Sequence, residues 1–122
     1  MPNPVVHFEI NARDGAAMQQ YYGDLFAWKI DASNPMNYGL VDTDAGGEGI
    51  MGGIGPSEDG SVSTLFYVQV PDVQAALDRA VSLGGSVVRP MEVIPGMVTM
   101  AVFADPEGNQ VGLVAEQTPP AE

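Results

Sequence analysis

The chain opens with a segment in which apolar and polar side chains alternate. Residues 5–11 show this period-two pattern, which predicts a strand with one buried face. The apolar face consists of Val6, Phe8 and Ile10, and the opposite face of His7, Glu9 and Asn11. Residues 18–25 then place apolar and aromatic side chains at the spacing of one helix face, and Asp14 can cap that helix.

Short strands and a second helix complete the predicted pattern. Strands are expected at 28–30, 38–41 and 49–54, the last weakened by its glycines. After turn-forming residues, the pattern of strand and helix returns at 65–70 and 73–81, with Asp72 as the cap and Gly84-Gly85 as the helix end. Three further strands are expected at 86–88, 98–104 and 111–115.

The two halves therefore share one element order and can be overlaid. A shift of 58 residues places His7 on Leu65, Glu9 on Tyr67 and Asn11 on Gln69, and a shift of 61 places Met51 on Gly112. We predict a single domain over residues 1–122, with a first repeat at about 5–55, a linker at about 56–62 and a second repeat at about 63–116.

Charge and cysteine content exclude several functions. The 122 residues carry 16 acidic and 4 basic side chains, a formal net charge of −12, so nucleic acid and anionic membrane surfaces are not expected partners. The acidity indicates either a solvated surface or attraction for a cationic small molecule. Without cysteine there is no disulfide framework, and without a signal-like N-terminus we expect a cytoplasmic protein.

Two motifs carry a resemblance to a known family. The first is His7-Phe8-Glu9-Ile10 followed by residues 21–28, and the second is 94–97 followed by 103–109. With the duplicated βαβββ order, the chain resembles the vicinal oxygen chelate superfamily, in its glyoxalase/bleomycin resistance protein branch. The resemblance implies an α+β fold in which two βαβββ repeats form a curved, cup-shaped mixed sheet with helices outside. It also implies a homodimer, with repeats paired within one chain or by swapping.

The resemblance further implies where a metal would bind. In metal-dependent members each repeat supplies one ligand from its first strand and one from its last. The corresponding positions here are His7, Met51, Leu65 and Gly112. Only His7 suits a hard divalent ion, so we expect no metal cofactor. A residual metal between His7 and Glu9, helped by Glu48 or Glu116, remains an alternative.

The cup implied by the resemblance would hold a small-molecule ligand. Its expected lining is His7, Glu9, Met51, Leu65, Tyr67, Gln69 and Gly112. The leading hypothesis is metal-free binding that sequesters a cationic aromatic compound, because Glu9 and several aromatic residues accompany the excess acidity. The alternatives are a lyase, isomerase or dioxygenase that uses His7 and Glu9 for acid–base chemistry, and an accessory domain without a ligand. His7 could also be no more than a hydrogen-bonded polar residue.

Overall fold

The computed structural model describes residues 2–43, 46–95 and 98–116. Gly96 and Met97 of the closing motif lie outside the described residues. The chain divides into two compact units. The first is Val6–Phe66, and the second comprises the rest of the described chain, so the division falls within strand β5 (Ser63–Val70). Each unit is described by itself.

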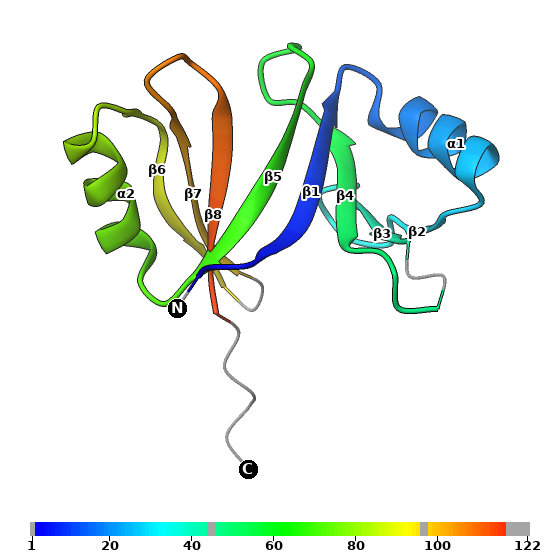
Figure 1. Cartoon of the computed structure of the whole chain (residues 1–122). Coiled ribbons are helices and arrows are strands. Elements are labelled where there is room, and N and C mark those ends of the chain that lie inside the picture. The colour runs from blue at the N-terminus through cyan, green and yellow to red at the C-terminus, as the bar shows by residue number, and fades with distance from the viewer. Residues whose placement is uncertain (1, 44–45, 96–97, 117–122) are drawn as a thin grey trace. The chain divides into compact units, whose positions relative to one another are not determined.

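The first unit contains one helix and a small mixed sheet (Figure 1). Its elements are β1 (Val5–Ala12), which joins it from Val6 onward, α1 (Gly15–Phe26), β2 (Lys29–Asp31), β3 (Gly39–Asp42) and β4 (Met51–Pro56). The strand order is β2-β3-β4-β1, in which β1 and β4 are parallel and the other pairs antiparallel. Helix α1 packs against β4 and β2.

The second unit repeats this arrangement (Figure 1). Its elements are the later part of β5, α2 (Val73–Ser82), β6 (Ser86–Ile94), β7 (Val98–Ala104) and β8 (Gln110–Ala115). The order is β5-β8-β7-β6, with β5 and β8 parallel. Its core joins α2 to the strands through Val70, Val73, Leu77, Ala101 and Leu113. The α+β class and the duplicated βαβββ order are therefore confirmed.

The helix ends follow the predicted chemistry. The side chain of Asp14 accepts a hydrogen bond from the backbone N–H of Ala17, and Asp72 accepts one from Ala75, each at 3.0 Å. Such caps satisfy backbone donors that have no partner within the helix. After α2, Gly84 takes a φ of 108°, a left-handed value that favours glycine at a helix end.

Strand β6 is longer than the sequence predicts. The pattern indicates 86–88, whereas the strand runs from Ser86 to Ile94 and contains Pro90. Its pairing with β7 slips twice, between Val87 and Arg89 and between Arg89 and Glu92. A proline has no N–H for a central ladder, but an edge strand with bulges accepts it. In the second unit β6 occupies such an edge.

The glycines of β4 have a packing reason that propensity alone does not reveal. The ring of Phe8 lies against Gly52, where a Cβ would overlap it. Tyr38 lies over Gly53 and Gly55, and a Cβ on Gly55 would come within 2.7 Å of its Cδ1. Glycine in a strand interior often marks such a close approach. Strand β4 thus lies between two aromatic rings.

Candidate functional site

The polar face of β1 carries the centre of the candidate site. Phe8 points to the helix side, with its ring centroid 5.4 Å from that of Trp28. His7 and Glu9 occupy the other face of β1 because successive side chains alternate. The parallel partner β4 places Met51 opposite His7 and Gly53 opposite Glu9. The faces predicted for this strand are confirmed.

Tyr38 connects the two polar side chains of this face. Its hydroxyl lies 3.1 Å from Nε2 of His7 and donates to Oε2 of Glu9, also at 3.1 Å. The other carboxylate oxygen of Glu9 accepts from Nδ2 of Asn11 at 3.2 Å, and the same amide donates to Oγ of Ser63 at 3.2 Å. A continuous chain of polar groups therefore crosses the face from His7 to Ser63.

The position of Tyr38 is fixed through its backbone as well as its ring. Oδ1 of Asn34 accepts from the N–H of Tyr38 at 3.0 Å, and Nδ2 of Asn34 donates to its carbonyl at 2.6 Å. The carbonyl of the preceding residue, Asn37, accepts from Nε2 of Gln19 at 3.0 Å. Because this turn and the glycines under the ring both constrain Tyr38, its hydroxyl is directed at His7 and Glu9.

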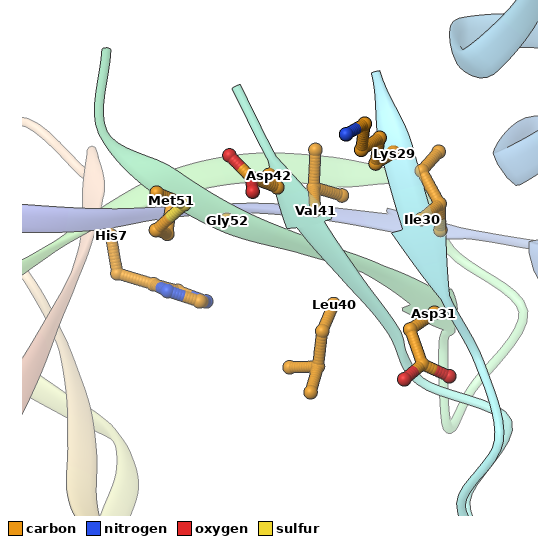
Figure 2. A pocket seen from close by; sticks show the side chains of 9 residues that line it. All are labelled: His7, Lys29, Ile30, Asp31, Leu40, Val41, Asp42, Met51 and Gly52. Atoms are coloured by element: carbon orange, nitrogen blue, oxygen red, sulfur yellow. The ribbon is translucent and has the colours of Figure 1, made fainter. Parts of the chain in front are cut away.

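A pocket of about 590 Å³ lies beside this chain of polar groups, within the first unit. Its lining residues are His7, Lys29, Ile30, Asp31, Leu40, Val41, Asp42, Met51 and Gly52. Figure 2 shows His7, Leu40 and Asp31 projecting from one side of the strands and Val41 from the other. Leu40 and Met51 are 49% and 40% exposed, so the pocket offers apolar surface next to an imidazole.

Comparison with known proteins decides the family. The model of the glyoxalase-like domain matches residues 7–114 of this chain, which includes both repeats. The chain belongs to the glyoxalase-like domain family. Its place in the vicinal oxygen chelate superfamily, expected from the sequence motifs, is confirmed.

The relatives of this glyoxalase-like domain support the assignment. A "putative glyoxylase CFP32" of Mycobacterium bovis and Mycobacterium tuberculosis is 30% identical over 112 residues. The match covers 86% of this chain and 42% of the relative, so the chain spans less than half the length of those curated proteins.

Two solved structures share the fold at low sequence identity. A glyoxalase/bleomycin resistance protein/dioxygenase superfamily member from Vibrio splendidus 12B01 has a TM-score of 0.62 and 16% identity, covering 94% of this chain and 100% of that one. Methylmalonyl-CoA epimerase from Mycobacterium tuberculosis has a TM-score of 0.65 and 13% identity, with coverages of 93% and 88%. At these identities the likeness concerns the fold.

The four family ligand positions of this glyoxalase-like domain do not form a site for a hard divalent metal. Leu65 has no donor atom and is 8% exposed, and Met51 offers a thioether. At Gly112 a side chain would overlap the ring of Tyr67 on the neighbouring strand. His7 is thus the one suitable ligand of the four. Within the described ranges, no three His, Asp or Glu side chains come together to hold a metal.

The structure places the other predicted site residues in both units. His7, Glu9 and Met51 come together in the first unit, whereas Leu65 is buried on the early part of β5. Tyr67, Gln69 and Gly112 belong to the second unit, where Tyr67 pairs with Gly112 in register. Sequence reasoning missed Tyr38. The signal for it was the alternation of Gly53 and Gly55, which marks a bulky group lying over the strand.

His7 has an altered acidity for a physical reason that the site supplies. Burial lowers the pKa of His7 from the ordinary 6.5, because a charged imidazolium loses hydration, and the negative charge of Glu9 opposes this shift. A lowered folded-state pKa means that the unfolded chain binds the proton more tightly. His7 therefore favours the folded state above pH 6.5 and loses this preference as the pH falls toward its lowered pKa.

We expect the free energy of unfolding to decrease as the pH falls from above 6.5, the ordinary pKa of histidine, toward the lowered pKa of His7. Denaturant unfolding at several pH values measures it, and His7→Gln should remove this part of the slope because His7 is the single histidine. Hydrogen bonds from Ser33, Ser61 and Asn109 lower the pKa of Asp31, Asp59 and Asp105, whose ordinary value is 3.8, so those carboxyls titrate in a separate, more acidic range. An unchanged slope in His7→Gln would contradict the expectation.

Proposed function

We propose that this chain binds a small organic molecule with a cationic group on the open face of the first unit, without a divalent metal. The observation that carries the proposal is the carboxylate of Glu9, which Tyr38 and Asn11 hold by one hydrogen bond to each oxygen. A carboxylate fixed in this way meets a ligand with little loss of conformational entropy, and it can accept further hydrogen bonds.

The pocket beside His7, which Tyr38 connects to Glu9, supports a ligand that is both apolar and cationic. Leu40 and Met51 offer exposed apolar surface, and Met adapts to ligands of different shape. Asp31 and Asp42 outnumber Lys29 among the charged lining residues. Since a concave site of one predominant charge concentrates its field, a positively charged planar ligand fits this lining better than an anion.

The proposal can be tested with substitutions at Glu9. We expect Glu9→Gln to weaken binding of aminoquinolines and bleomycin, used as cationic aromatic probes, by about tenfold or more, because a charge-assisted hydrogen bond is lost. Titration calorimetry measures the affinity, with EDTA present so that binding cannot depend on a divalent metal. Neutral isosteres of the probes should bind equally to both proteins.

Glu107→Gln is the matched control, because it removes the same charge from an exposed turn after β7. If Glu107→Gln weakens binding as much as Glu9→Gln, the effect is one of net charge and the proposed site is wrong. No binding of any cationic probe by the unaltered chain would refute the proposed function as well.

General acid–base chemistry is a second candidate, and one observation favours it. A half-buried imidazole with a lowered pKa is hydrogen-bonded to a phenol that is hydrogen-bonded to a carboxylate. Groups arranged in this way can take and return a proton near neutral pH. The name of the mycobacterial relative, "putative glyoxylase CFP32", agrees with an enzymatic role for this family.

We also propose that the partner of this chain is a second copy of itself, in the cytoplasm. The edge strand β6 has four exposed apolar side chains, which support self-association: Val87, Val88, Met91 and Val93. Such a cluster on one strand is more typical of an interaction surface than of a solvated edge. Across the described residues, both helices are too short or too polar to span a bilayer.

A further inference from the structure

The hydrogen bonds around Tyr38 have a defined direction. The carboxylate of Glu9 has no hydrogen to donate, so in its contact with Tyr38 the phenol must be the donor. A phenol has a single hydrogen. Once that hydrogen points at Glu9, the phenol oxygen can only accept in its contact with Nε2 of His7. Nε2 must then carry a hydrogen.

We infer that Tyr38 is a positioning residue that holds His7 as the tautomer with its hydrogen on Nε2, which makes Nδ1 the acceptor atom of the ring. This assigns a direction to the whole chain of groups, from Nε2 of His7 through the phenol to the carboxylate. The inference deepens the proposed function. The tautomer follows from the hydrogen bonds alone, and only the role of the site rests on the proposed function. A group that contacts Nδ1 of His7 must then donate the hydrogen of that contact, whichever of the two candidate functions holds.

Three independent features fix the phenol strongly enough for this role. The side chain of Asn34 bonds both backbone groups of Tyr38, so the segment cannot rotate without losing two hydrogen bonds. Gln19 bonds the carbonyls of Asn37 and Ile54, at 3.0 and 2.8 Å, and so joins the turn to β4. The missing side chain at Gly53 leaves the space that the ring fills. Because both the backbone and the ring of Tyr38 are constrained, its hydroxyl stays within reach of His7 and Glu9.

The electrostatics of His7 agree with a neutral, tautomerically fixed ring. Burial favours the uncharged imidazole by lowering its pKa. A neutral imidazole has one donor and one acceptor nitrogen, and the bond made by one nitrogen decides the role of the other. Tyr38 makes that bond at Nε2.

Nitrogen-15 NMR of the full chain at about pH 8 tests the inference, since the single histidine gives one set of ring signals. In the unaltered chain we expect the Nε2–H tautomer in about tenfold excess or more, with slow exchange of its hydrogen. Tyr38→Phe keeps the ring over Gly53 but removes the acceptor. It should lower the excess to the mixture of a solvent-exposed imidazole and speed the exchange. The control Tyr21→Phe removes a hydroxyl from an exposed tyrosine on α1 and should change neither.

Two results would overturn the inference. One is a ring that carries its hydrogen on Nδ1 in the unaltered chain. The other is a Tyr38→Phe protein that is folded and keeps both the original tautomer excess and the slow exchange. Neither measurement uses a ligand, so a failed titration with cationic probes would refute the proposed function and leave this inference standing, and the reverse also holds.

Discussion

Replacing Gly53 with alanine is expected to lower the free energy of unfolding by about 2 kcal/mol or more and to break the chain from His7 to Glu9. A Cβ at this position would overlap the phenol of Tyr38, while Asn34 holds the Tyr38 backbone in place. The ring must leave, and both hydrogen bonds of its hydroxyl leave with it. The lower entropy of the unfolded alanine chain returns only about 0.4–1 kcal/mol. Urea unfolding measures the loss.

Gly23→Ala is the matched control for this prediction. Gly23 lies inside α1, and a Cβ there would meet its nearest neighbours, Ile30 and Trp28, at an ordinary 3.7 Å. Alanine is the better helix former, so this variant should be more stable by about 0.5–1 kcal/mol. If Gly53→Ala is as stable as the unaltered chain and its histidine signals are unchanged, the packing of Tyr38 on β4 is wrong.

Ile54→Ala should cost more stability than any other single truncation proposed for this chain, about 3 kcal/mol and about 10 °C in Tm. Ile54 is fully buried on β4, opposite Ile10 in the register with β1. Removing three carbon atoms there loses the favourable free energy of their transfer from water to the interior. It also leaves a cavity that the surrounding strands cannot fill. Thermal and urea unfolding give the two quantities.

Ile50→Ala, the same substitution four residues earlier, is the control that separates the effect of burial from that of the change in residue type. Ile50 precedes β4 and is 41% exposed, so Ile50→Ala should cost less than about 1 kcal/mol. Equal losses at the two positions would mean that Ile54 does not occupy the interior of the first unit.

Much of the fold could be predicted because its signals are local. Alternation marked β1, and Asp14 and Asp72 marked the starts of both helices with the cap bonds that the structure shows. The full length of strand β6 was not predicted, because Pro90 indicates the end of a strand. In the structure an edge position with two register slips accommodates this proline. Whether proline ends a strand depends on which strands are neighbours, and that information is not local.

The candidate site was predicted only as far as one strand could specify it. His7 and Glu9 share a face because residues two apart on a strand do so. Their connection through Tyr38 depends on a turn at Asn34 and on the pairing of β3 with β4, across 29 to 31 residues of sequence. The glycines of β4 held the missing information, but by strand propensity alone they indicated a weak strand. In the structure they make room for Tyr38.

The ring of Tyr38 and a side chain at position 53 would compete for the same space over β4, so the residue types at positions 38 and 53 should be coupled in evolution. One side chain occupies the space that the other position leaves empty, so neither can change freely while its counterpart stays. A family member with a small residue in place of Tyr38 is free to carry a side chain in place of Gly53, whereas one with tyrosine is not. The two positions should therefore vary as a pair, and a relative that keeps both also keeps the means to orient its histidine.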